Sequence, residues 1–227
     1  MDKVSEKIKV KMNTLKNLKR SLLDYNIDGY IIPKNDEYFQ EYSNPNRLEK
    51  ISKFSGSAGL CVILKKKNLL FVDGRYTIQA KNETKNKFII LGISQQQIKK
   101  YTKNLSIGYD PKLFTSETLK RNFSECKLKP IHNNLVDLKT KNNGKMTMDK
   151  QFFHLKKNIT GEGHESKIQK ILKILKRKKI DNIFISAPEN VAWLLNIRGR
   201  DMQYSPCPNC QIILTQEKKI FFLSDGK

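Results

Sequence analysis

Two cysteines, Cys207 and Cys210, have the C-x-x-C spacing that zinc sites and redox sites use. A structural zinc site needs four ligands, and no second C-x-x-C or histidine pair follows to complete one. A redox C-x-x-C opens a helix after a strand. Here two prolines and a strand-like run over 211–215 surround the pair instead. The sequence therefore favours the start of a strand over a metal site or a reactive thiol.

Histidine, serine and acidic residues do not form a catalytic pattern either. The chain has three histidines: His132, His154 and His164. Glu162 and Glu165 flank the last of these, but they begin a predicted helix, where the helix dipole favours acids in the first turn. Ser55 and Ser57 have no histidine placed to act as their base. We expect no catalytic residue and no metal site in this chain.

The run Asp73-Gly74-Arg75 is the strongest candidate for a binding function. Asp73 and Gly74 suit a tight turn from a strand into a helix, and Asp73 can cap that helix. Arg75 then lies at the helix start, where a cation meets the unfavourable end of the helix dipole. Either a bound ligand or a nearby carboxylate would compensate this charge.

A second candidate is the run Arg198-Gly199-Arg200-Asp201. Gly199 permits a close approach of two backbone segments or a positive φ angle. Asp201 could pair with Arg198 or Arg200 and so fix the loop. The only tryptophan, Trp193, precedes this run among apolar neighbours, and we expect it in the core of the second domain.

The formal net charge is +22, from 44 Lys and Arg against 22 Asp and Glu in 227 residues. A charge of this size first suggests a polyanion as the partner. Only seven of the basic residues are arginine, the residue whose planar fork contacts phosphates and guanine. Lysine, asparagine and isoleucine are enriched together, which indicates a drift in composition rather than a selected surface. Nucleic acid is therefore not the expected partner.

The composition also narrows the class of protein. The apolar content of 38% is typical of a globular chain. No apolar run approaches the roughly 20 residues of a membrane span, and residues 1–6 lack the apolar segment of a signal peptide. Four cysteines are too few for a disulfide scaffold. We expect a cytoplasmic protein with no membrane partner.

The chain repeats its own pattern. Residues 15–32 and 168–185, at an offset of 153, each show apolar residues at helical spacing followed by a buried strand. Residues 59–75 and 211–227, at an offset of 152, each read as a hairpin that ends in Asp-Gly. This register predicts two tandem copies of one α/β unit. We expect a first domain over 1–138, a linker over 139–160 and a second domain over 161–227.

The two predicted copies differ in length. The first continues for about 60 residues beyond Asp73-Gly74, to Asp137, whereas the second stops just after Asp225-Gly226. We therefore expect the chain to be the front part of a longer protein, truncated within its second domain. The missing strands would leave an open sheet edge that favours pairing with a partner.

Six short motifs occur along the chain: Tyr30-Ile31-Ile32-Pro33, Phe54-Ser55-Gly56-Ser57-Ala58-Gly59, Asp73-Gly74-Arg75-Tyr76, Gly108-Tyr109-Asp110-Pro111, Asn134-Leu135-Val136-Asp137 and Ala192-Trp193-Leu194-Leu195-Asn196-Ile197-Arg198-Gly199. In this order and spacing they resemble the N-terminal part of aminopeptidase P, the Xaa-Pro aminopeptidase of the three-domain, cytosolic type. The resemblance runs from about residue 15 to the C-terminus.

This resemblance implies two creatinase N-terminal-like α/β domains, each a mixed sheet flanked by helices, with the second incomplete. In the family a third, pita-bread domain follows and holds two divalent metal ions, usually manganese. These ions activate the water that cleaves the bond before a proline. The resemblance further implies that Arg75 contacts the peptide substrate and that Glu41 lies toward a dimer contact. It places Arg198 and Asp201 near the substrate side of the cleft.

The sequence leaves two main hypotheses open. In the first, the chain is the non-catalytic N-terminal part of an Xaa-Pro aminopeptidase that acts on proline-containing peptides. It then shapes the substrate cleft, contributes to a homodimer, holds no cofactor itself and is inactive alone. In the second, it is a stand-alone basic module for nucleic acid or a protein partner, and polyanion binding would fall steeply with salt.

Overall fold

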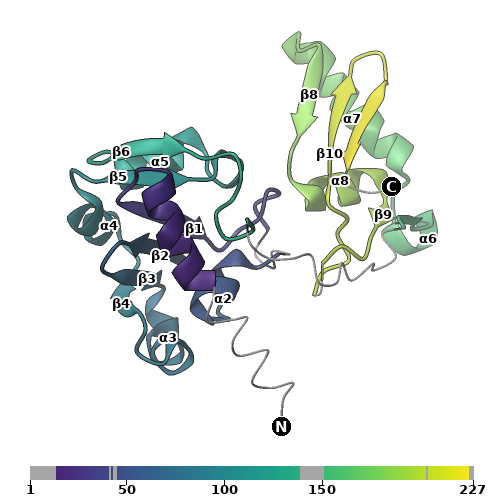
Figure 1. Ribbon diagram of the computed structural model, residues 1–227. Coiled ribbons are helices and arrows are strands. Elements are labelled where there is room, and N and C mark those ends of the chain that lie inside the picture. Colours follow the sequence, from purple (N-terminus) through teal and green to yellow (C-terminus); the bar gives the residue numbers. More distant parts are fainter. Residues whose placement is uncertain (1–13, 41, 43–44, 139–150, 203, 225–227) are drawn as a thin grey trace. The chain divides into compact units, whose positions relative to one another are not determined.

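The protein folds into two α/β units, seen in a computed structural model that describes residues 14–40, 42, 45–138, 151–202 and 204–224 (Figure 1). Unit 1 comprises Met1–Glu37 and Pro45–Asn143, and unit 2 comprises Tyr38–Asn44 and Gly144–Lys227. Among the described residues, none of the helices combines the length and the apolar content that crossing a bilayer requires.

Unit 1 is built on a six-stranded mixed sheet in the order β4-β3-β2-β1-β5-β6. Its strands are β1 (Gly29–Pro33), β2 (Gly59–Leu64), β3 (Asn68–Val72), β4 (Ile89–Gly92), β5 (Ser106–Tyr109) and β6 (Lys127–Pro130). The first three strands pair antiparallel with one another. The other three join in parallel, β4 beside β3 and β5 and β6 beyond β1.

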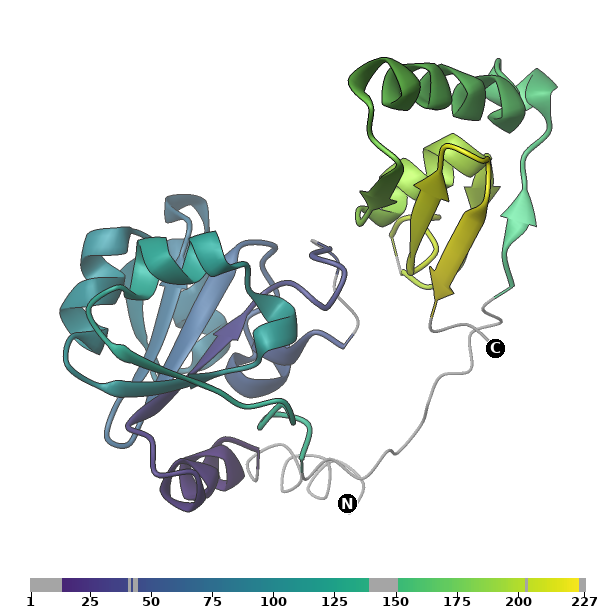
Figure 2. The same cartoon turned by 90° about the horizontal axis from the view of Figure 1, so that it is seen from above.

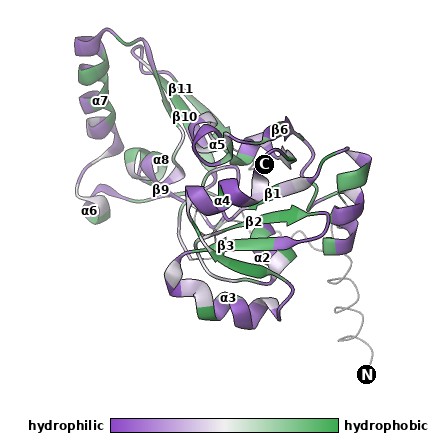
Figure 3. Ribbon diagram, turned by 90° about the vertical axis from the view of Figure 1, so that its left-hand side faces the viewer, coloured by the Kyte–Doolittle hydropathy of each residue, from purple (hydrophilic) through white to green (hydrophobic). Residues whose placement is uncertain are grey.

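Helices cover both faces of the unit 1 sheet (Figures 1 and 2). They are the helix over 14–24, α2 (Arg47–Ser52), η1 (Gly74–Tyr76), α3 (Thr77–Thr84), α4 (Gln95–Thr102), η2 (Pro111–Leu113) and α5 (Ser116–Phe123). Cys61 and Ile63 of β2 pack into the cluster formed with helix 14–24, α2 and α3. Leu60 and Val62 pack into the cluster formed with α4 and α5. Because both faces are buried, β2 and β3 are continuous apolar runs rather than alternating ones (Figure 3).

Unit 2 has a three-stranded antiparallel sheet in the order β11-β10-β8. Its elements are β7 (Phe153–His154), α6 (Lys157–Thr160), α7 (His164–Lys178), β8 (Asn182–Ile185), α8 (Pro188–Leu195), β9 (Ile197–Arg198), β10 (Cys210–Thr215) and β11 (Ile220–Ser224). The strands β7 and β9 form a separate two-stranded pair. Thus β7 and α6 lie within 139–160, the range predicted to be a linker.

The two units repeat one three-strand core, as the sequence predicts, but with a different register for the middle strand. Ile31 pairs with Val62 in unit 1, and Phe184 pairs with Ile213 in unit 2. The offset is therefore 153 for the first strand but 151 for the second, where the sequence comparison gave 152. The turn after β10 is longer by one residue, because Thr215 bonds to Lys219 whereas Leu64 bonds to Lys67. That extra residue restores an offset of 152 for the third strand.

Candidate functional site

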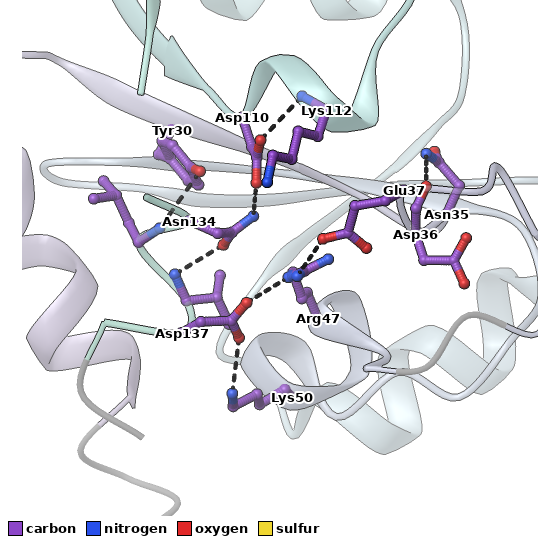
Figure 4. Close-up of polar contacts among 12 residues, drawn as sticks. Tyr30, Asn35, Asp36, Glu37, Arg47, Lys50, Asp110, Lys112, Asn134 and Asp137 are labelled. Atoms are coloured by element: carbon purple, nitrogen blue, oxygen red, sulfur yellow. Dashed lines mark hydrogen bonds and ion pairs between the residues drawn. The ribbon is translucent and has the colours of Figure 1, made fainter. Parts of the chain in front are cut away.

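Arg47, in the first turn of α2, is the centre of a polar cluster in unit 1 (Figure 4). Only 7% of its side chain is exposed. Its Nη2 donates to Oε1 of Glu37 at 2.7 Å, and its Nε donates to Oδ2 of Asp137 at 2.7 Å. Burial disfavours the charged form, but these two ion pairs raise the pKa of Arg47 above its ordinary value. Lys50 adds a bond from Nζ to Oδ1 of Asp137 at 3.1 Å.

A second set of hydrogen bonds holds the same closing segment of unit 1 (Figure 4). Asp110 is buried, and its Oδ2 accepts from Nδ2 of Asn134 at 2.9 Å while its Oδ1 accepts from the backbone of Lys112 at 3.0 Å. The backbone N–H of Leu135 donates to the hydroxyl of Tyr30 at 3.5 Å. Three of the six sequence motifs therefore meet here, and their contacts fasten the end of unit 1 to its first strand and to α2.

Sequence reasoning did not single out Arg47. Its two carboxylate partners lie 10 and 90 residues away, so no local spacing indicates the cluster. The available signal is that Arg47 is one of only seven arginines in a lysine-rich chain. A buried site with two carboxylates favours arginine, because its guanidinium can donate to both at once.

Arg75 lies in the short helix η1, directly after β3. As predicted, Asp73 is the N-cap, and its Oδ1 accepts from the Arg75 backbone at 3.0 Å. The same oxygen accepts from Nε of Arg75 at 2.9 Å, and these bonds lower the pKa of the Asp73 carboxyl. The guanidinium also lies 5.6 Å from the ring centre of Tyr76. Arg75 is 76% exposed, so its charge is compensated locally and yet accessible.

The 54–59 motif packs beside Arg75 through the helix that follows it. The backbone N–H and the hydroxyl of Ser55 donate to the two carboxylate oxygens of Glu83 at 2.8 and 2.7 Å. Gln79 donates to the same hydroxyl at 2.9 Å, and Ser57 and Tyr76 share a hydrogen bond at 2.9 Å. Partial burial disfavours the charged form of Glu83, but these bonds hold its pKa below the ordinary value. The serines therefore anchor a turn, and two of the sequence motifs form one surface around Arg75.

Arg198 lies in β9, immediately after α8, and its side chain bonds to backbone carbonyls. Its Nη1 donates to the carbonyl of Ala192 at 3.1 Å and to that of Ile197 at 2.8 Å. Ala192 belongs to the last turn of α8, where carbonyls lack partners within the helix. Arg198 thus joins α8 to β9, and its place near a substrate stays a prediction.

The loop after Arg198 is closed by two contacts. Of the two reasons for Gly199, the structure shows close backbone approach: a Cβ there would lie 2.7 Å from Cβ of Pro208 and 2.9 Å from its Cα. Asp201 is 8% exposed, and its Oδ2 accepts from the backbone of Asn209 at 2.9 Å. Glu41, the remaining site candidate, lies outside the described residues.

Trp193 is 57% exposed, so its predicted place in the core of the second domain is wrong. Val191 and Leu194 occupy the buried face of α8, and the helical period turns Trp193 away from that face. The ammonium group of Lys167 lies 4.3 Å from the tryptophan ring centre. It also donates to the backbone carbonyl of Trp193 at 2.8 Å and to Oδ1 of Asn196 at 2.7 Å.

The cysteines and histidines do not form a metal centre. Cys210 begins β10, as the sequence indicates, and burial, followed by the nearby Asp201 and Cys207, raises its pKa to about 12. The rings of His154 and His164 meet edge to face at 5.3 Å. Across the part of the chain that the structure describes, no group of three or more His, Cys, Asp or Glu is arranged to hold a metal ion. These residues therefore do not fit a dinuclear metal site.

The chain matches family models and known proteins along most of its length. Two models, each described as the Creatinase/Prolidase N-terminal domain, match residues 14–138 and 141–227. A probable Xaa-Pro aminopeptidase P from Aspergillus fumigatus is 34% identical over 237 residues, which cover 95% of this chain and 36% of that protein. One from Pyricularia oryzae is 31% identical over 217 residues, which cover 88% and 35%. The chain thus spans little more than a third of the length of these relatives.

The same relationship is found among solved structures. The X-prolyl aminopeptidase from Caenorhabditis elegans, described as a cytosolic enzyme with a di-nuclear active site, superposes with a TM-score of 0.80 at 26% identity. The match covers 95% of this chain and 39% of that one. The tandem α/β units predicted from the repeat are thereby confirmed. With one model matched to each unit, this chain belongs to the creatinase/prolidase N-terminal domain family.

Proposed function

We propose that this chain is the non-catalytic N-terminal part of a metal-dependent Xaa-Pro aminopeptidase. The supporting observation is the asymmetry of the matches, which cover 95% of this chain but only 36% of the Aspergillus protein and 39% of the Caenorhabditis enzyme. In this proposal the remaining length of the parent enzyme holds the two metal ions and cleaves the bond before a penultimate proline. The chain itself shapes the peptide cleft and contributes to a homodimer in the cytoplasm.

Within this function, Arg75 binds the peptide substrate. An exposed guanidinium suits a peptide carbonyl or a terminal carboxylate, because it presents several N–H donors in one plane. Asp73 and Tyr76 hold it in place from either side, which reduces the entropy lost on binding. Arg198 and Asp201 act as positioning residues for the loop after α8, and Glu41 belongs to the dimer contact.

The reading frame beyond the Lys227 codon tests the proposal first. An in-frame pita-bread domain supports it, and a natural stop codon at that point contradicts it. The second test is peptidase activity: the purified 227-residue chain with Mn²⁺ should release no amino acid from an Xaa-Pro peptide. Release that a chelator abolishes would show that this chain is catalytic by itself.

Arg75 is then tested in the full-length enzyme. Arg75→Ala should lower kcat/KM, whereas Arg121→Ala should leave it unchanged, because Arg121 is an exposed arginine of α5 in the same unit. An unchanged kcat/KM for Arg75→Ala would exclude contact with the substrate while leaving the role of the chain as a whole intact.

A further inference from the structure

Unit 1 contains a pocket of about 700 Å³ outside the motif clusters. Residues of helix 14–24, the end of α2, the end of α3 and the segment before β4 line it. This volume is within the range of about 300–1,000 Å³ that small-molecule sites occupy. Neither the proposed function nor the six motifs account for it.

The floor of the pocket is apolar. Ile51 and Phe88 are 5% and 8% exposed, and Leu15 lies beside them. The hydroxyls of Ser52 and Thr84 also lie at the floor, but each donates at 2.7 Å to the carbonyl four residues earlier in its own helix. The floor therefore offers apolar surface and hydroxyls whose protons are already engaged.

The rim of the pocket is basic. Five lysines line it: Lys16, Lys19, Lys53, Lys85 and Lys87. They make up five of the eleven lining residues, whereas 37 of the 227 residues of the chain are lysine, so composition alone does not explain them. The one lining carboxylate, Glu83, is bound to Ser55 and Gln79. The rim therefore presents positive charge with little local compensation.

Lys19 is the most informative of these lysines, because it is partly buried and burial lowers its pKa. Within the described residues, no carboxylate forms an ion pair with Lys16, Lys19, Lys85 or Lys87. A cation that is partly removed from water without a counter-ion is unfavourable. An anion at the rim would remove this cost.

We propose that this pocket binds a small amphipathic anion, with an alkyl chain on the Ile51–Phe88 floor and a phosphate or carboxylate head at the lysines. The apolar floor accounts for the chain, and the lysine rim accounts for the charged head. A purely polar anion would leave the floor in water, and a neutral alkyl compound would leave the lysines without a counter-ion.

Calorimetric titration of the full chain with dodecyl phosphate, kept monomeric, tests this proposal. We expect one site, binding that weakens with salt, and about fourfold weaker affinity for each methylene removed, from the transfer free energy of a buried CH₂. Dodecyl maltoside, which is neutral, should bind at least tenfold more weakly. Equal affinity for the neutral and the anionic compound would overturn the proposal.

Charge reversal separates this pocket from other apolar surfaces of the chain. Lys19→Glu should weaken dodecyl phosphate binding at least tenfold. Lys99→Glu should leave the affinity unchanged, because Lys99 is a partly exposed lysine of α4 outside the pocket. Equal effects of the two variants would overturn the proposal. Lys19→Gln, which removes charge without adding an acid, should lie between Lys19→Glu and the unmodified chain.

Vesicles distinguish a dispersed ligand from a membrane headgroup with the same chemistry. Because the pocket takes up the alkyl chain, co-sedimentation with phosphatidic acid vesicles should be the same for the unmodified chain and for Lys19→Glu. A chain that binds such vesicles but not dispersed dodecyl phosphate would contradict the assignment of the pocket.

Discussion

The two units share a three-strand core but differ in what covers its second face. Register places three pairs of positions in equivalence: Ile31 and Phe184, Leu69 and Phe221, Phe71 and Leu223. The unit 1 member of each pair is at most 1% exposed, because α4 and α5 pack over it. The unit 2 members are 48% to 55% exposed.

This difference teaches that the strands alone do not determine burial. The unit 2 face is as apolar in sequence as its unit 1 counterpart, yet no described helix packs over it. On the other face, α7 and α8 bury Ile212 and Leu214 completely. Exposed apolar surface of this kind marks a place where another element or molecule binds. In unit 1, the strand β5 and the helices α4 and α5 supply that layer.

The largest difference between the units is expected for a matched pair of truncations, Leu69→Ala and Phe221→Ala. Leu69→Ala should lower the free energy of unfolding of unit 1 by about 2–5 kcal/mol, because it leaves a cavity in a covered face. Phe221→Ala should change that of unit 2 by less than about 0.5 kcal/mol, since its side chain is largely in water. Urea unfolding followed by hydrogen exchange measures both.

Tryptophan fluorescence gives an independent readout of the same pair. Trp193 is the only tryptophan and lies in unit 2, so its signal follows that unit alone, whereas circular dichroism follows both. A loss of several kcal/mol in the Trp193 transition of Phe221→Ala would show that the face is covered in solution, and the comparison would then fail.

A second matched pair addresses the helix after the first strand of each unit. Both α2 and α8 end in a left-handed C-cap, Lys53 and Asn196, which makes Asn190 the counterpart of Arg47. Arg47→Met should destabilise unit 1 by about 2–3 kcal/mol, because charge-assisted hydrogen bonds to two carboxylates are lost. Asn190→Met, at an exposed position, should have an effect below about 0.5 kcal/mol on unit 2. Equal effects would mean that the Arg47 cluster does not hold unit 1 together.

Unit 2 depends instead on a buried lysine. Lys167→Met should lower the midpoint of the Trp193 transition by an amount equivalent to about 1.5–2 kcal/mol, because the buried amide oxygen of Asn196 loses its donor. Lys170→Met is the control, since Lys170 forms an exposed ion pair with Glu162 that is worth less than about 1 kcal/mol. If both variants melt alike, the buried lysine contributes no more than a surface one.

The fold was largely predictable because its signals are local. Apolar runs and helical periodicity indicated the strands and helices of both units, and the repeat indicated their common plan. The one-residue error in the middle strand came from a turn whose length periodicity does not report. The linker prediction overlooked β7, which pairs with β9 more than 40 residues away.

The candidate site was only partly predictable because its contacts are long-range. The Asp73 cap lies two residues from Arg75, and the sequence indicated it. The partners of Arg47 are far apart in the chain, and the sequence indicated none of them. Trp193 was misplaced because hydrophobic character does not reveal which side of a short helix faces the core, and Lys167 meets its ring from α7.

The smallest effect is expected from pH, and it too should separate the units. Glu83 of unit 1 has a lowered pKa in the folded state, so it contributes stability that is fully present above its unfolded pKa of about 4.3. That contribution is lost as the pH falls through the lower, folded pKa. Unit 1 should therefore weaken in this acidic window, and Glu83 plays no part in the Trp193 transition.

Ser55→Ala tests the cause of this shift. It removes the hydroxyl that donates to Glu83 but keeps the backbone N–H, so the pKa of Glu83 should rise part of the way to its ordinary value. NMR titration of the Glu83 carboxyl measures the change, and Ser57→Ala, which bonds to Tyr76 instead, is the control. If Glu83 titrates identically in both variants, the Ser55 hydroxyl does not stabilise its charge. The loss of unit 1 stability in acid would then need another carboxyl, for which Asp28, held at a lowered pKa by Lys65, is the next candidate.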